Sequence, residues 1–321
     1  MKTPLQPPTV DVDASSGWRR ADAPRRPVLF INPKSGGGKA AHAGLAERAR
    51  QRGIAAVVLA QGQDLVSAVG EAAAGGADAL GMAGGDGSLA VVASAAAAHE
   101  LPFVCVPAGT RNHFARDVGV DRYDLVGALD AFTDGVERRI DLAEVNGRAF
   151  LNNVSLGIYG EAVRKSAYRN AKVRTILETA DEVLGPGAEL TAVHLVDDLG
   201  REHDHLAIVL VSNNPYALDH PLARGTRPAL DTGHLGIALL DTPGEGHRPL
   251  GRTWTAPRLE MTAAKAVHAG VDGEAMDLSS PLRFVIRPRA LRVLISSRHP
   301  GMSPSARHVT PPPVWPRGHA S

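Results

Sequence analysis

The chain has 321 residues, of which 44% are hydrophobic and 21% are charged, and its formal net charge is +1. This length predicts about two domains, and the apolar fraction is typical of a globular protein with its own core. The near-zero net charge argues against a general nucleic-acid-binding protein, and a single cysteine excludes both an intramolecular disulfide and a cysteine-rich metal site.

The two ends of the chain have the composition of disordered segments. Residues 1–26 lack the apolar stretch of a secretory signal and are expected to form a disordered arm, and the proline-rich residues 298–321 are expected to form a disordered tail. No uncharged apolar run reaches the roughly 18 residues of a membrane span. We therefore expect no transmembrane segment and, by default, a cytoplasmic protein.

From residue 27 onward, strand-forming and helix-forming segments alternate. The strand-forming runs are 28–32, 55–60, 77–85 and 102–109, and the helix-forming segments are 39–53, 65–76 and 88–100. Asp64 is expected to cap the second of these helices. Strands that alternate with helices of this length predict a parallel sheet with helices on both faces, so residues 27–135 are expected to form a doubly wound α/β domain.

After about Gly135 the sequence changes to strands joined by tight turns. Asn146-Gly147 suits the type I′ turn of a β-hairpin, and a second hairpin is expected around 198–200. The runs "HLGIALLD", "RLEMTAAKAVHAG" and "LRFVIRP" predict further strands, and one helix at about 161–184 interrupts them. Residues 136–297 are therefore expected to form a mainly antiparallel β domain, a sandwich or a flattened barrel.

Three glycine-bearing loops follow the predicted parallel strands. They are "NPKSGGGKA" after the first strand, "GGDGS" after the third and "PAGTRNHFAR" after the fourth. Because the carboxyl ends of parallel strands lie at one edge of a sheet, the three loops are expected to meet in a crevice there. Any one of them alone is best interpreted as a plain turn, but three at one edge favour phosphate binding through backbone N–H groups.

The polar side chains of these loops support the same interpretation. Asp86 can hold Mg²⁺ or accept a proton from an attacking hydroxyl. The other candidates for polar contacts are Lys34, Ser35, Ser88, Thr110 and Asn112. A Walker A loop is excluded because Ala40 follows Lys39 and Pro33 occupies the position of the first glycine, and the first loop also lacks the spacing of the Gly-x-Gly-x-x-Gly dinucleotide fingerprint.

These segments resemble the motifs of the diacylglycerol kinase catalytic-domain family, which includes bacterial lipid kinases and sphingosine kinases. The matching motifs are "NPKSG" at 32–36, "GGDGS" at 84–88, "PAGTRN" at 107–112 and "DGE" at 272–274. The similarity covers about residues 27–297 and includes "NNVSLGIYGEAV" and "NNPYA". It implies an N-terminal nucleotide-binding α/β domain, a C-terminal β-sandwich substrate domain whose last strand returns to the first domain, and ATP in the cleft between them.

The resemblance also implies roles for individual residues. Glu274 matches the proton acceptor of the family and Asp86 matches the aspartate near metal and phosphate, so both are candidate catalytic residues. The candidate nucleotide-binding residues are Asn32, Pro33, Lys34, Ser35, Gly36, Gly84, Gly85, Asp86, Gly87, Ser88, Thr110 and Asn112. The implied cofactors are ATP and Mg²⁺, with Asp86 as a metal ligand. Residues alone favour a hairpin turn at "VDGEAM", and both interpretations hold if the turn presents Glu274 to the cleft.

Two departures from the family pattern bear on the site. His113 replaces a common aspartate, and a packed neutral ring is favoured over a hydrogen-bond donor. Thr232 replaces the second aspartate of an Asp-Asp-Gly motif that helps to bind a structural Mg²⁺ beside backbone carbonyls, here those of Ala229 and His234. Because a neutral hydroxyl is a poor ligand for a hard cation, this second metal site is either missing or served by Asp231.

The predicted helix at 161–184 offers a basic surface. Lys165, Arg169 and Lys172 fall on one helix face, which by itself favours a solvated face. With a lipid substrate, the same face predicts reversible contact with a membrane. The histidines of "HDH" at 203–205 are typical of an exposed strand rather than of a metal site.

The preferred hypothesis is an ATP- and Mg²⁺-dependent lipid kinase that phosphorylates a hydroxyl, with diacylglycerol as the first acceptor to consider. One alternative is a kinase of a soluble substrate, similar to NAD kinases or phosphofructokinases, which share a "GGDG" loop. Another is a nucleotide-binding protein that has lost catalysis, which Thr232 and His113 motivate and the retained Asp86 and Glu274 oppose. The sequence names neither the lipid nor the oligomeric state, and a homodimer stays open.

Overall fold

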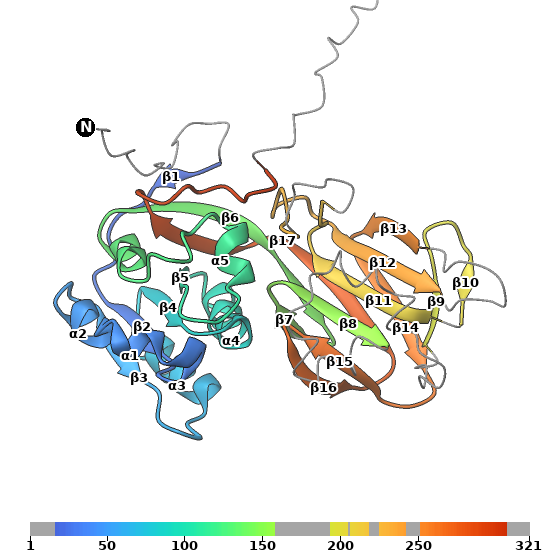
Figure 1. The fold of residues 1–321 in the computed structure, drawn as a ribbon, viewed down its shortest axis with the longest axis horizontal. Coiled ribbons are helices and arrows are strands. Elements are labelled where there is room, and N and C mark those ends of the chain that lie inside the picture. Colours follow the sequence, from blue (N-terminus) through green and yellow to red (C-terminus); the bar gives the residue numbers. More distant parts are fainter. Residues whose placement is uncertain (1–16, 158–192, 205, 218–224, 242–250, 307–321) are drawn as a thin grey trace, which may run out of the picture.

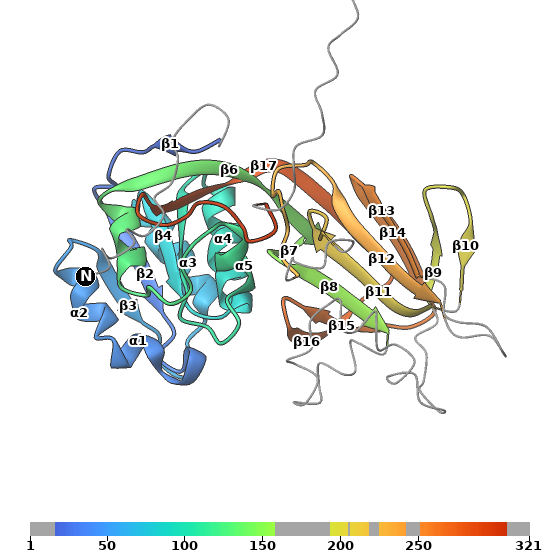
Figure 2. The same cartoon turned by 45° about the horizontal axis from the view of Figure 1, so that its top comes forward.

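The computed structural model describes residues 17–157, 193–204, 206–217, 225–241 and 251–306. An α/β unit lies beside a unit built of β-sheets, as Figures 1 and 2 show from two directions. The expected fold, an α/β domain followed by an antiparallel β domain, is therefore confirmed. The helix expected at 161–184, with Lys165, Arg169 and Lys172, lies outside the described residues.

The α/β unit is built on four parallel strands. They are β2 (Pro27–Ile31), β3 (Ala55–Val58), β4 (Ala79–Ala83) and β5 (Pro102–Val106), in the spatial order β3-β2-β4-β5. The strand order reverses between β2 and β4. The connections that leave these two strands therefore run to opposite faces of the sheet, which opens a crevice at its carboxyl edge.

Helices cover both faces of this sheet because alternate strand residues point to opposite sides. The helices are α1 (Lys39–His42), α2 (Leu45–Arg50), α3 (Leu65–Ala74), α4 (Asp86–Ala98) and α5 (His113–Asp117), with the 3₁₀ helices η1 (Ser35–Gly37) and η2 (Gly127–Phe132). Leu29 shares one core with Leu45 of α2, and Phe30 shares the other with Leu89 of α4. The Asp64 carboxylate accepts a hydrogen bond from the Val66 amide at 3.0 Å, so the expected cap of α3 is confirmed. None of the helices in the described ranges has the length and apolar character needed to cross a membrane.

Two long strands, β6 (Gly135–Val145) and β17 (Leu282–Ser296), join the two units (Figure 1). One end of β17 pairs in parallel with β5, with Val293 opposite Phe103, and its other end pairs with β14 (Arg258–Ala263). The α/β sheet therefore continues into the second unit without a break. The final strand does return to the first domain, as the family resemblance implied.

The second unit consists of two antiparallel sheets that pack face to face (Figure 2). One is the continuation of the large sheet through β7 (Arg148–Phe150), β9 (Val193–Val196), β10 (Glu202–His203), β14 and β17. The other contains β13 (Gly251–Ala256), β12 (Leu235–Asp241), β11 (Leu206–Asn213), β8 (Asn153–Gly157), β15 (Val267–Val271) and β16 (Glu274–Leu278), in that spatial order. The run "RLEMTAAKAVHAG" forms two strands, β14 and β15, which lie in different sheets.

The two expected hairpin turns are present. Asn146 and Gly147 have φ of 50° and 79° between the paired strands β6 and β7, as a type I′ turn requires. Strands β9 and β10 pair on either side of residues 197–201. Of the sandwich and the flattened barrel that the sequence left open, the structure has the sandwich, because two separate sheets pack against one shared core.

Residues 17–26 and 298–306 are ordered, so the expected disorder of these parts of the arm and the tail is wrong. The short strand β1 (Arg19–Arg20) pairs with β6. Trp18 is 5% exposed, and its indole Nε1 donates a hydrogen bond to the carbonyl of Gly301 at 2.6 Å. Trp18 thus connects the N-terminal segment to the C-terminal segment. The composition of each segment as a whole does not indicate this contact.

Candidate active site

The three glycine-bearing loops meet at the carboxyl edge of the parallel sheet. A Cβ on Gly36, in the first loop, would clash with the carbonyl oxygen of Ala108, in the third. A Cβ on Gly109 would lie 2.9 Å from the Cα of Gly85, in the second loop. Only glycine permits backbone to approach backbone this closely. The convergence expected from the topology is therefore present, and it brings together the three motifs.

The first loop holds its shape through its own side chains. The Asn32 side chain accepts a hydrogen bond from the Lys34 amide at 3.1 Å, and the Lys34 ammonium donates to the Gln61 side chain at 3.0 Å. Lys39, which begins α1, donates to the carbonyl of Gly109 at 3.2 Å. Lys39 was not among the expected site residues. Its contact with the third loop places a cation in the crevice that the three loops form.

The "GGDGS" segment is the start of a helix rather than a separate loop. Gly85 is the N-cap of α4, and Asp86, Gly87 and Ser88 form its first turn. The amides of a first helical turn have no partner within the helix, and the helix dipole adds partial positive charge at this end. The crevice therefore receives the positive end of a 13-residue helix.

Asp86 connects the second loop to the third. Asp86 is 9% exposed, and its carboxylate accepts hydrogen bonds from the amides of His113 and Phe114, at 3.4 and 3.3 Å, where α5 begins. Burial lowers the pKa of His113 despite the negative charge of Asp86, which agrees with a packed neutral ring. Asn112 is 2% exposed, and its side-chain Nδ2 donates to the carbonyl of Pro107 at 3.0 Å. Thr110, in contrast, is exposed at the crevice.

Glu274 reaches the crevice from the second unit. It follows a tight turn between β15 and β16 in which Asp272 and Gly273 have φ of 49° and 86°. The Glu274 carboxylate lies against Gly87 so closely that a Cβ on Gly87 would clash with it. The predicted hairpin turn therefore does present Glu274, and it brings the β15–β16 turn next to the start of α4. Arg111 lies nearby, with Nη1 3.7 Å from the position of a Cβ on Gly273.

Asp272 holds this turn in place. Its carboxylate accepts hydrogen bonds from the amides of Leu151, Asn152 and Asn153, at 2.8, 2.7 and 3.2 Å. Burial raises the pKa of Asp272 to about 7, even though two of these amides favour the charged form. The sequence showed Asp272 only as a turn residue. Its side chain positions the residue two places further along the chain, Glu274.

A buried ion pair stabilises the backbone segment that Asp272 contacts. Arg227 and Asp117 are 0% and 5% exposed, and their side chains are 2.6 Å apart. The guanidinium also donates to the backbone carbonyls of Leu151, at 2.6 Å, and of Asn213. The pair thus fastens α5 to the segment that Asp272 binds. The family-like segments "NNVSLGIYGEAV" and "NNPYA" marked this location, but no motif marked Arg227 or Asp117.

Asp231 and Thr232, the candidate side-chain ligands of a second metal site, have other partners in the structure. Asp231 forms an ion pair with Arg138 at 3.0 Å, and the Thr232 hydroxyl donates to the Asn214 side-chain carbonyl at 2.6 Å. Among the residues that the structure describes, no three His, Cys, Asp or Glu side chains cluster as possible metal ligands. The assignment of Asp231 and Thr232 as metal ligands stays a prediction. The Arg138 guanidinium beside Asp231 argues against that assignment.

The site described above can be compared with known proteins. The N-terminal part, residues 26–145, matches the family model for the diacylglycerol kinase catalytic domain. The chain is 31% identical over 295 residues to a Pseudomonas aeruginosa protein named "Probable lipid kinase YegS-like", covering 85% of this chain and 95% of that protein. It is 41% identical over 91 residues to a Bacillus subtilis diacylglycerol kinase, covering 28% of this chain and 30% of that one.

A solved structure has the same fold. The crystal structure of a diacylglycerol kinase from Bacillus anthracis str. Sterne superposes with a TM-score of 0.59, covering 85% of this chain and 97% of that one. The sequence identity is 18%, so this likeness speaks for the fold alone.

Proposed function

The chain belongs to the diacylglycerol kinase catalytic-domain family of lipid kinases, and on this premise we propose that it transfers the γ-phosphoryl group of ATP to a lipid hydroxyl. Diacylglycerol is the first acceptor to test, and Mg²⁺ is the accompanying cation. The observation that carries the proposal is the position of the Glu274 carboxylate against Gly87, at the start of α4. A proton acceptor from the second unit thereby faces the phosphate-binding loops of the first.

The phosphates of ATP would lie against the first two loops. The start of α4, within Gly84–Ser88, offers backbone amides there together with the positive end of the helix dipole. Asn32–Gly36 would border the phosphates from the first loop, where the amides of Asn32, Lys34 and Ser35 already donate to partners within the protein. Thr110 and Asn112 border the same crevice from the third loop. Phosphoryl transfer depends mainly on positioning and on neutralising charge, which these groups and Lys39 supply.

Glu274 would take the proton of the acceptor hydroxyl. The hydroxyl oxygen forms a bond to the γ-phosphorus, the bond between that phosphorus and the oxygen bridging to the β-phosphate breaks, and ADP leaves with the electron pair. The proton passes to the Glu274 carboxylate. An alcohol is almost fully protonated at neutral pH, so a positioned base raises the rate of this step.

Asp86 fits a cation that is shared with the triphosphate. Mg²⁺ usually binds to one or two protein carboxylates together with phosphate oxygens and water. The Asp86 carboxylate is engaged by two amides at 3.3 and 3.4 Å, which are long hydrogen bonds, so its oxygens keep acceptor capacity. When bound, the cation would neutralise charge on the phosphate groups.

One experiment separates this proposal from its alternatives. Purified protein is incubated with radiolabelled ATP, Mg²⁺ and total lipid extract, and in parallel with diacylglycerol, NAD or fructose 6-phosphate. A labelled lipid supports the proposal. Label on NAD or the sugar phosphate alone would identify a kinase of soluble substrates, and ATP binding by calorimetry without any labelled product would identify a nucleotide-binding protein without catalysis.

A further inference from the structure

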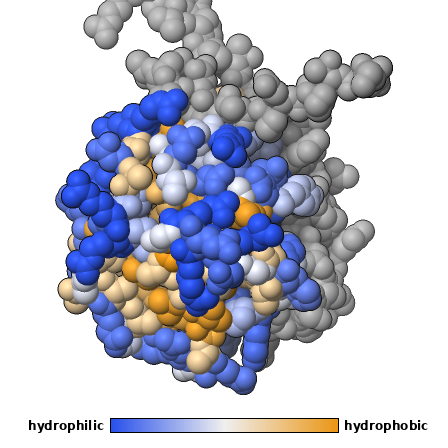
Figure 3. All heavy atoms as spheres, turned by 90° about the vertical axis from the view of Figure 1, so that its left-hand side faces the viewer, coloured by the Kyte–Doolittle hydropathy of each residue, from blue (hydrophilic) through white to orange (hydrophobic). Residues whose placement is uncertain are grey.

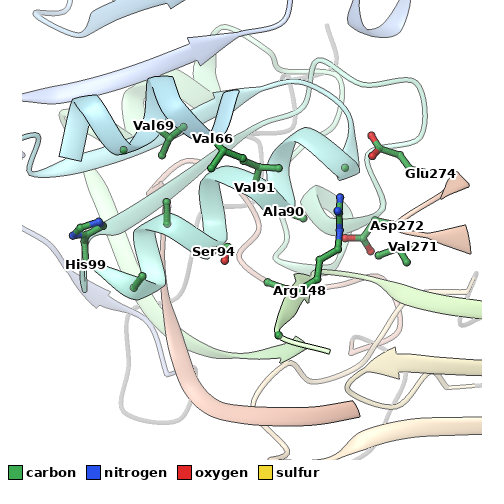
Figure 4. A pocket seen from close by; sticks show the side chains of 16 residues that line it. Val66, Val69, Ala90, Val91, Ser94, His99, Arg148, Val271, Asp272 and Glu274 are labelled. Atoms are coloured by element: carbon green, nitrogen blue, oxygen red, sulfur yellow. The ribbon is translucent and has the colours of Figure 1, made fainter. Parts of the chain in front are cut away.

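A cavity of about 440 Å³ begins at Glu274 and follows the outer face of α4 (Figure 4). Its α4 wall consists of Gly87, Ala90, Val91, Ser94, Ala95 and Ala98. Their spacing of three and four residues puts them on one helix face. Val66 and Val69 of α3 and the β6–β7 hairpin form the other walls. We call this cavity the α4 groove.

The α4 groove is polar at one end and apolar along its length. Glu274, Asp272 and Arg148 line one end, and His99 lies at the opposite end, as Figure 4 shows. Between them the α4 side chains are alanines and a valine, with Ser94 as the single hydroxyl. From Gly87 to Ala98 the helix rises by about 16 Å. An apolar groove of this length with a carboxylate at its end matches an amphiphile that has a chain and a polar terminus.

The small residues of α4 keep the groove open. Ser94 and Ala95 are half-buried and Ala98 is exposed, so larger side chains at these positions would fill the space. Val66, on the rim, is 66% exposed. Figure 3 views the end of the α/β unit that lies away from the second unit, where hydrophilic side chains cover most of the face and apolar ones gather in its lower part; the groove itself is seen in Figure 4. An apolar groove with a few polar groups gathered at one end is the usual form of a small-molecule site.

We propose that the α4 groove binds the hydrocarbon chain of the acceptor lipid, with the acceptor hydroxyl at Glu274. This inference rests on the proposed function, because it assigns a chain-binding subsite to the same site. Arg148 is exposed and lines the polar end of the groove. Its guanidinium places a positive charge beside the location where the transferred phosphoryl group carries negative charge.

The test uses a bulky side chain inside the groove and a matched one outside it. Ser94→Phe fills the middle of the α4 groove, and Ser67→Phe adds the same ring to the exposed face of α3, outside the groove. A diacylglycerol with a photoactivatable diazirine in its acyl chain is cross-linked to each full-length protein, and the adducts are located by mass spectrometry. We expect adducts within residues 66–70 or 90–98. Ser94→Phe should reduce their yield roughly tenfold, because the ring occupies space that the lipid chain would need. Ser67→Phe should leave the yield unchanged.

A kinetic comparison makes the test independent of cross-linking chemistry. The ratio of turnover on dioleoylglycerol to turnover on diacetylglycerol should fall in Ser94→Phe and stay as in the wild type in Ser67→Phe. If Ser94→Phe does not fold, as judged by circular dichroism, Ala98→Phe at the exposed end of α4 replaces it. Adducts confined to other parts of the chain, with an unaltered turnover ratio in Ser94→Phe, would contradict chain binding in the α4 groove. That result would leave the proposed phosphorylation of lipid untouched. Adducts in the groove of a protein that phosphorylates no lipid would support the groove and overturn the kinase.

Discussion

The carboxylate of Glu274 lies against the backbone of Gly87, so that a methyl group on Gly87 would overlap it. Gly87 belongs to the first turn of α4, at the carboxyl edge of the parallel sheet, and Glu274 begins a strand of the opposite unit. Gly87, the last glycine of the "GGDG" motif, therefore has two structural roles. It offers an amide at the helix start, and it leaves the space that the carboxylate of the second unit occupies.

Gly87→Ala should displace Glu274 and lower turnover with lipid about tenfold or more, because general-base catalysis depends on the position of the base. Turnover is measured with radiolabelled ATP. In a Glu274→Ala background the same change should have little further effect, since the displaced group is gone. An equal loss in both backgrounds would mean that the methyl group disturbs the nucleotide instead.

Glu274→Gln should reduce turnover by a factor of roughly 10²–10⁴ while ATP still binds, because glutamine has the same shape but accepts no proton at this step. Calorimetry with ATP and a lipid phosphorylation assay check the two parts. Glu260→Gln, at an exposed carboxylate of β14, is the control and should behave as the wild type. Normal turnover by Glu274→Gln would transfer the role of base to another group, with Asp86 as the first to examine.

Asp272→Asn should flatten part of the pH dependence of stability. The pKa of an aspartate in an unfolded chain is about 4, and in the folded protein burial raises the pKa of Asp272 to about 7. The folded state therefore holds the proton more tightly. The stability that this group contributes is complete below the unfolded pKa and is lost as the pH rises through the folded value.

Urea unfolding of the wild type and of Asp272→Asn, at about pH 5 and about pH 8, measures this contribution. The decrease in the free energy of unfolding between the two pH values should be larger for the wild type. Asp22→Asn changes an exposed carboxylate and should follow the wild type. A decrease of the same size in all three proteins would contradict the raised pKa.

Arg227→Met should lower the free energy of unfolding by about 3–5 kcal/mol, because it leaves the Asp117 carboxylate buried without its partner. The exposed pair of Arg283 and Glu260 provides the control. Their side chains are 67% and 56% exposed, so Arg283→Met should cost less than about 1 kcal/mol. Replacing both Arg227 and Asp117 by apolar residues should cost less than the sum of the two single changes. Strict additivity would show that the two charges are not coupled.

The parts of the site that the sequence predicted are those governed by topology and local backbone geometry. Parallel strands bring their carboxyl ends to one edge, so the meeting of the three loops followed from their order alone. Asp272-Gly273 and Asn146-Gly147 carry the residues that a type I′ turn demands, and the structure has both turns. Asp64 caps its helix for an equally local reason.

The missed features depend on contacts between distant segments. Arg227 and Asp117 carry ordinary charges in the sequence, and only their joint burial makes them structural. Trp18 lies in a stretch whose composition indicates disorder, yet it packs against the returning C-terminal segment. The start of α4 was expected two residues late because glycines in a sequence indicate a loop, whereas Gly85 serves as an N-cap and the helix begins at Asp86.

The shared strand β17 limits how such a protein can be recombined. Its 15 residues contribute hydrogen bonds to the parallel sheet at one end and to the sandwich at the other. A chimera that joins the α/β unit of this chain to the β-sheet unit of a relative would have to cut through that strand or exchange it as well. Since β6 runs beside β17 along most of its length, the cut would cross two strands. The two halves are thus not interchangeable modules. If the proposed function holds, a change of acceptor would arise by substitutions within one continuous fold, in residues such as those that line the α4 groove.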